Sequence, residues 1–126
     1  MSDNRTTLND AVPEQTTCRI SGNLVDEAGA ALGSGQLSTL VMTLYAEVPG
    51  DPIINSISAR NILNVNQGTI DAGGNFVITL LPADNALSSQ ANVASEAHVI
   101  LLEFTWGSGK AGKHEIVFTV RNLKKV

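Results

Sequence analysis

The fold class is decided by residues 98–121, which read HVILLEFTW, GSGKAG and KHEIVFTVR in succession. In the first run, apolar side chains recur at every second position, at Ile100, Leu102, Phe104 and Trp106. The last run repeats this spacing at Ile116, Phe118 and Val120. Successive side chains of a strand point to opposite faces, so this period predicts two strands whose alternate side chains line the core. The glycine-rich segment between the two runs predicts a hairpin.

Working outward from this hairpin, the chain consists of short β-type runs separated by turns that contain glycine or aspartate. The predicted strands cover 18–25, 37–45, 61–65, 68–71 and 75–81. The stretch 86–97 is rich in Ala, Ser and Gln and is where we expect a short helix. About seven strands with almost no helix predict an all-β fold, an immunoglobulin-like antiparallel β-sandwich. A jelly roll or small barrel would give much the same pattern.

Length and composition indicate a single folded domain. The chain has 126 residues, of which 43% are hydrophobic and 16% charged, against a typical charged fraction of about 25%. Its apolar runs fall short of the roughly 20 residues that a membrane span needs, and the first residues lack the apolar core of a signal peptide. We therefore expect a soluble domain without an export signal and without a membrane partner. The net charge of −4 also argues against nucleic acid as a partner.

Residues 1–17 differ from the rest of the chain. They are polar, contain Pro13 and show neither strand nor helix periodicity, so we interpret them as an extended arm preceding one domain, residues 18–126. Ordering a backbone costs about 1–2 kcal/mol per residue, and the arm has little apolar material to offset this. We therefore expect an outside partner to hold the arm by strand addition at Thr6–Leu8 or Thr16–Cys18.

The sequence offers little for catalysis or for a cofactor. The segment 107–113 has the Gly-x4-Gly-Lys spacing of a phosphate-binding loop, but His114 stands where that motif needs Ser or Thr, and a strand should follow instead of a helix. Cys18 is the only cysteine, and no pair among Cys18, His98 and His114 has zinc-ligand spacing. We expect both histidines to lie at the surface or at strand ends, with no metal, nucleotide or other cofactor bound.

The carboxylates do not suggest an acid–base pair either. The candidates are Asp71, Asp84, Glu96, Glu103 and Glu115. We expect most of them to be ionised and solvated, at turns or on outward strand positions. No Gly-x-Ser-x-Gly elbow is present. The protein is predicted not to be an enzyme.

Opposite ends of the chain carry opposite charge. From Lys110 onward five basic residues face Glu115 alone, whereas the first thirty residues hold five acidic residues and two arginines. One interpretation of this pattern is ordinary solvated surface. The alternative is a pair of complementary patches that join neighbouring copies, or one patch that docks on an oppositely charged partner. The candidate interface residues are Thr6, Thr7, Leu8, Thr16, Thr17, Lys110, Lys113, Arg121, Lys124 and Lys125.

Several segments resemble known families. GNLVDEAG (22–29), LVMTLY (40–45) and GTIDAGGNF (68–76) resemble bacterial immunoglobulin-like domains. A closer likeness, over most of the chain after Gly22, is to small structural proteins of tailed bacteriophages. The segments that carry it are NILN (61–64) with Gly68, PADN (82–85), EFTW (103–106), GKHE (112–115) and FTVRNL (118–123). The arm lies outside this resemblance.

The resemblance implies a non-enzymatic virion component, assembled in the bacterial host cytoplasm, and it transfers no catalytic residue. A capsid decoration or minor head protein is the leading hypothesis, with the major capsid protein, other virion proteins and further copies of this chain as partners. A neck or tail position stays open. The alternative is a recognition module on the particle surface that binds a host saccharide or receptor, although only 4% of the residues are aromatic and Trp106 is expected in the core.

Overall fold

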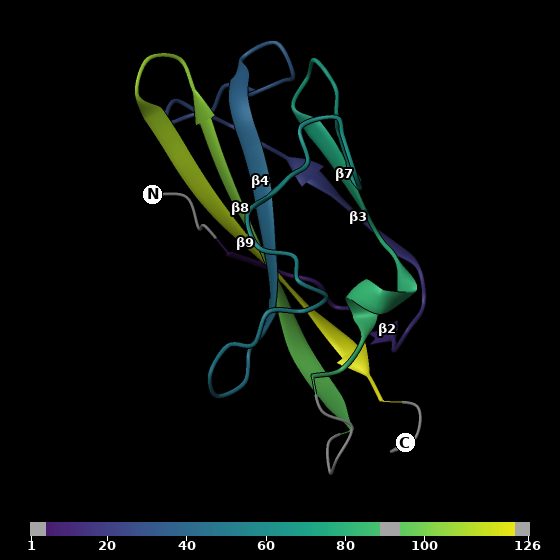
Figure 1. Ribbon diagram of the computed structural model, residues 1–126. Coiled ribbons are helices and arrows are strands. Elements are labelled where there is room, and N and C mark those ends of the chain that lie inside the picture. The colour runs from purple at the N-terminus through teal and green to yellow at the C-terminus, as the bar shows by residue number, and fades with distance from the viewer. Residues whose placement is uncertain (1–4, 89–93, 123–126) are drawn as a thin grey trace.

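The computed structural model describes residues 5–88 and 94–122, which form two β-sheets on either side of one core (Figure 1). The larger sheet has the order β1-β9-β8-β4-β5, and β2 also pairs with β9. Its strands are β1 (Arg5–Thr7), β2 (Val12–Pro13), β4 (Leu37–Ala46), β5 (Arg60–Asn61), β8 (Ser95–Trp106) and β9 (Lys110–Arg121). The smaller sheet has the order β3-β7-β6, with β3 (Cys18–Asn23), β6 (Gly68–Ile70) and β7 (Asn75–Leu80). The predicted all-β fold is confirmed.

The hairpin of β8 and β9 is the longest pairing in the described chain. It runs from Ser95 opposite Arg121 to Trp106 opposite Lys110. The connecting turn is only Gly107–Gly109, shorter than the predicted 107–112, and both glycines have a positive φ, 58° and 80°, that other residues rarely adopt. The predicted inward positions of this hairpin are buried, with one exception: Trp106, at the tip, is only partly buried.

The core forms between alternate side chains of the two sheets. From the larger sheet, β4 contributes Leu40, Met42 and Leu44, all at most 1% exposed. From the smaller sheet, β7 contributes Phe76, Ile78 and Leu80 to the same cluster. Strands β4 and β7 show a two-residue period of burial, because each buries one face against the opposite sheet.

Two predicted elements differ from the structure. Within the predicted strand 61–65, only Asn61 is paired, as part of the two-residue β5. The helix expected at 86–97 is wrong where it can be compared: Ser95–Ala97 begin β8 because they pair with β9, and the helical turn, η1, lies earlier at Pro82–Asn85. Residues 89–93 of that prediction lie outside the described residues. No helix in the described ranges is long and apolar enough to cross a bilayer.

The arm has its partner within the same chain, which corrects the expectation of an outside one. Strands β1 and β2 both run parallel to β9, with Thr6 opposite Ile116 and Val12 opposite Val120. The backbone amide of Leu8 donates to the carbonyl of Val117 at 2.8 Å, and Leu8 and Val12 pack against the core. The arm's own apolar content is small, but β9 of the same chain offers it an open edge within reach.

Deleting residues 1–13 should therefore destabilise the isolated domain. The loss of the partly buried Leu8 and Val12 and of the β1 and β2 backbone pairs should lower the free energy of unfolding by about 1–3 kcal/mol. Urea denaturation of parent and truncated protein measures this. The full-length double variant Leu8→Ala, Val12→Ala separates apolar packing from strand pairing. A truncated chain as stable as the parent would contradict the pairing of the arm with β9.

Candidate functional site

A groove of about 300 Å³ lies where the β8–β9 hairpin extends past the end of the smaller sheet. Strands β8 and β9 have twelve residues each, whereas β3 and β7 have six, and β3 ends at Asn23 opposite Asn75. The inward face of the hairpin tip therefore has no strand opposite it among the described residues. Segment 23–27 forms the other wall of the groove.

Two aromatic rings line the hairpin side of this groove. Phe104 and Trp106 are stacked, with ring centroids 5.7 Å apart and planes 27° from parallel. They pack over Gly112 on β9, where an added Cβ would lie 2.7 Å from one ring carbon of Phe104 and 3.3 Å from a ring carbon of Trp106. Glycine at this position thus allows both rings to lie against the backbone of the neighbouring strand.

The opposite wall is a loop held by local hydrogen bonds. Oδ1 of Asp26 accepts from the backbone amides of Ala28 and Ala30, both at 2.9 Å. Glu27 forms a 2.7 Å ion pair with Lys110 at the start of β9. The hydrogen bond from Lys110 is the main cause that lowers the pKa of Glu27, so its carboxyl is ionised near neutral pH. These contacts tie the loop to the hairpin beside the groove.

His114 lies between this groove and a second hollow of about 200 Å³ next to the arm, and lines both. Its Nε2 is 2.9 Å from the hydroxyl of Thr6 in β1. Nδ1 of the same ring has no protein partner among the described residues. His114 is partly exposed, as one of the two expected positions allows, and it lies within β9 and not at its end.

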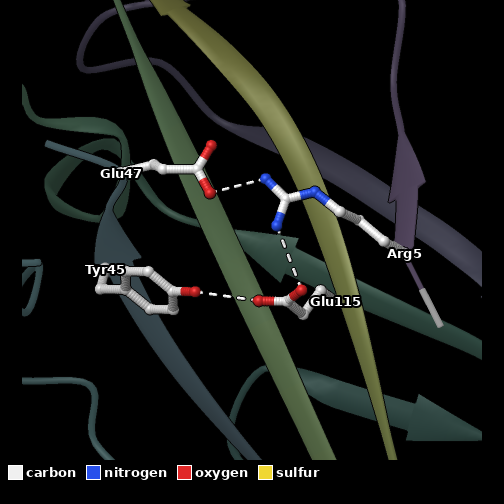
Figure 2. A network of polar contacts seen from close by, with 4 residues as sticks. All are labelled: Arg5, Tyr45, Glu47 and Glu115. Carbon is white, nitrogen blue, oxygen red and sulfur yellow. Dashed lines mark hydrogen bonds and ion pairs between the residues drawn. The ribbon is translucent and has the colours of Figure 1, made fainter.

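On the outer face of the larger sheet, a polar network ties the arm to the sheet (Figure 2). Arg5 donates to Glu47 at 2.6 Å and to Glu115 at 3.1 Å, and the hydroxyl of Tyr45 donates to Glu115 at 3.0 Å. Burial, followed by the neighbouring Glu115, raises the pKa of Tyr45 to about 12, so the phenol stays protonated as a donor. The network links β1, β9 and β4 across the intervening β8.

A second polar cluster is buried, which corrects the expectation for His98 and Glu96. His98 is 0% and Glu96 5% exposed, because both share the inward side of β8 with Ile100. Oε1 of Glu96 lies 2.7 Å from Nε2 of His98, and Oε2 accepts from the hydroxyl of Ser88 at 2.6 Å. The carboxylate stands between the hydroxyl and the imidazole, so His98 does not contact Ser88 as a general base would. The cluster joins Ser88 to β8 through the carboxylate of Glu96.

Asp84 was expected at a solvated turn, but it is buried as well. Its carboxylate accepts from Asn55, Gln67 and the backbone amide of Leu81, at 2.8, 2.5 and 2.8 Å. These bonds fix η1 against the ends of β6 and β7.

Within the described residues, neither the candidate metal ligands nor the segment that resembles a phosphate-binding loop forms such a site. Within 5–88 and 94–122, no three His, Cys, Asp or Glu side chains are grouped as metal ligands would be. His98 pairs with Phe118 and His114 with Leu102, four positions apart along the hairpin. Segment 107–113 consists of a three-residue turn and the first residues of β9, so no helix follows it.

Six of the candidate interface residues lie in or directly after β1 and in β9 of the larger sheet. Thr6 and Thr7 are in β1, Leu8 follows it, and Lys110, Lys113 and Arg121 are in β9. Thr16 and Thr17 precede β3, where the hydroxyl of Thr16 donates to the carbonyl of Pro13 at 2.7 Å. Lys124 and Lys125 lie outside the described residues. Lys110 and Lys113 are each paired with a carboxylate of this chain, Glu27 at 2.7 Å and Glu103 at 3.5 Å.

Sequence reasoning missed the groove, although part of its signal was present. The alternation correctly assigned Phe104 and Trp106 to the inward face, and the predicted strand lengths already differed. The proximity of segment 23–27 to the hairpin tip is a long-range contact that no local pattern encodes.

No family model and no curated protein matches this chain. Function is therefore inferred from its own residues and their geometry.

The close packing at Gly112 can be tested by substitution. Gly112→Ala should destabilise the protein by about 1–3 kcal/mol, because its methyl group has to displace the Phe104 ring. Gly35→Ala is the matched control, since an added Cβ there meets no atom within 4 Å. Chemical denaturation measures both variants. Equal stability of the two would show that the rings do not rest on β9.

The buried Glu96–His98 pair should make stability depend on pH. Burial lowers the pKa of His98, so the unfolded chain binds a proton more readily and stability should fall as the pH drops below about 6.5. Burial opposes ionisation of Glu96, but hydrogen bonds from Ser88 and His98 outweigh it and lower its pKa, so more stability is lost below about pH 4.5.

Thermal unfolding at pH 7, 6 and 5 tests the histidine contribution. His98→Gln should have a lower melting temperature at pH 7 but a smaller decline between pH 7 and 5 than the parent. An unchanged decline would assign this pH dependence to other groups.

Proposed function

We propose that this chain is a non-enzymatic structural protein of a tailed-bacteriophage virion, a capsid decoration or minor head protein with an immunoglobulin-like fold. The likeness of most of the chain after Gly22 to small virion proteins is the starting point. The observation that carries the proposal is the strand order of the two sheets. It supports the immunoglobulin-like fold independently of the likeness in sequence.

In the immunoglobulin arrangement, strands B, E and D form one sheet and C, F and G the other, with C′ added beside C in variable-type domains. Strands β3, β7 and β6 take the places of B, E and D, and β4, β8 and β9 take those of C, F and G. The short β5 beside β4 corresponds to C′, and β1 and β2 add an edge beside G.

The contacts within the chain suit a rigid structural component that does not turn over a substrate. The arm is fastened to β9 by backbone pairing and by Arg5, and η1 is fastened by the buried Asp84. Because the arm and η1 are already held in place, the domain loses little conformational entropy when it docks on a capsid, and this favours attachment.

The attachment surface we assign is the outward row of side chains on β9, where Lys113 and Arg121 are exposed and basic and Glu115 between them is paired with Arg5. Lys113 is 69% exposed, and its 3.5 Å pair with Glu103 is a weak surface contact. Arg121 at the end of β9 is also exposed. An acidic patch on a neighbouring virion subunit would complement this row.

Immunogold electron microscopy of purified particles whose genome encodes this chain tests the proposal. We expect labelling of the capsid at regular sites. Labelling confined to neck or tail would keep the virion role but overturn the capsid position, and absence of the chain from purified particles would overturn the virion role.

Matched charge reversals test the attachment surface. Arg121→Glu should reduce the copies per particle several-fold, whereas Arg19→Glu, an equally exposed change on β3 of the other sheet, should leave occupancy unchanged. Melting curves of both variants confirm folding. Equal occupancy of the two would remove β9 from the interface.

A further inference from the structure

The groove at the hairpin tip combines an aromatic platform with polar groups, which is the composition of a small-molecule site. We infer that it binds one pyranose unit of a saccharide, stacked on Trp106. This inference goes beyond the proposed structural role and does not depend on it, since it rests only on the lining of the groove.

The apolar part of the platform is fixed before any ligand arrives. Trp106 is partly exposed, and stacking on Phe104 and packing over Gly112 restrict its ring. A ring already held in place loses little rotamer entropy on binding. The C–H face of a pyranose is flat and apolar, so it can bury surface against such a ring.

The polar part of the lining offers both acceptors and donors. The second oxygen of Asp26, Oδ2, accepts no hydrogen bond within the described chain, because both loop amides bind Oδ1. Nδ1 of His114 is likewise unpartnered in the described ranges, because Thr6 occupies Nε2. Sugar hydroxyls both donate and accept, so they can bind to either kind of atom.

The charges around the groove favour a neutral ligand. Lys110 compensates Glu27 at 2.7 Å, and Asp26 and Lys113, which also line the groove, carry opposite charges. With these charges balanced, no net field remains that would select either a cation or an anion such as phosphate or sulfate. A polyhydroxylated ligand with one apolar face satisfies the rings and the polar groups together.

The size of the groove limits how much of a glycan it can hold. About 300 Å³ is at the lower end of the range of small-molecule sites. One sugar ring, terminal or within a chain whose remainder lies in solvent, fits this space. With so few contacts, we expect a dissociation constant on the order of 1 mM for a monosaccharide.

Trp106 is the only tryptophan of the chain, so its fluorescence reports on the groove directly. The probes are the methyl pyranosides of glucose, galactose, mannose and N-acetylglucosamine, with sorbitol and tetramethylammonium as comparators. We expect at least one pyranoside to give a saturable change in emission and both comparators to give none. The inference is overturned if no pyranoside saturates up to high millimolar concentration, or if only tetramethylammonium does.

A pair of isosteric variants places the ligand within the groove. Asp26→Asn keeps an oxygen for the amides of Ala28 and Ala30 but replaces Oδ2 by a donor, so saccharide binding should weaken at least five-fold with little change in melting temperature. Asp71→Asn is the control: Asp71 forms the same kind of turn, accepting from Gly73 and Asn75, and does not line the groove. Unchanged affinity in Asp26→Asn would overturn the placement.

Discussion

The pairing of β8 with β9 is the constraint on which the rest of the structure depends. These twelve-residue strands stand in the middle of the larger sheet, so each has a second neighbour, β4 on one side and the arm on the other. Their inward residues Ile100, Leu102 and Phe118 supply fully buried parts of the core that the smaller sheet covers. A change in the register of this hairpin by one residue would turn these side chains outward and expose the core.

The same hairpin brings charged residues from the two ends of the chain into contact. Because β9 takes the arm as its neighbour, Arg5 comes within 3.1 Å of Glu115. Because the hairpin tip lies beside segment 23–27, Lys110 meets Glu27 at 2.7 Å. Both pairs are exposed to solvent, which screens their attraction, so their effect is to orient the arm and the loop more than to stabilise the fold. The arm also covers the open edge of β9, which would otherwise be available for pairing with another chain.

Local patterns in the sequence predicted the strands but not their surroundings. The two-residue period correctly identified the inward faces of β8 and β9, because burial on one face imposes that period directly. It also assigned Trp106 to the inward face, but it could not show that the opposite sheet ends before that position. His98 and Glu96 share the inward positions of β8 with Ile100, so the same period contained the signal for their burial; their polarity hid it. The parallel pairing of the arm depends on contacts more than one hundred residues apart, which no local pattern records.

The groove follows from the unequal lengths of the two sheets. Strands β8 and β9 are six residues longer than β3, and the wall opposite their tip is segment 23–27, which starts at the last residue of β3. A chain that needed only a closed core could end the hairpin earlier or place polar side chains at its tip. Instead the tip carries the only tryptophan, stacked on Phe104 over a glycine and facing a loop tied down by Asp26 and by the ion pair of Glu27 with Lys110. Apolar surface left partly open beside fixed polar groups breaks the inside–outside pattern that holds elsewhere in the fold, and such local departures are expected at sites that bind.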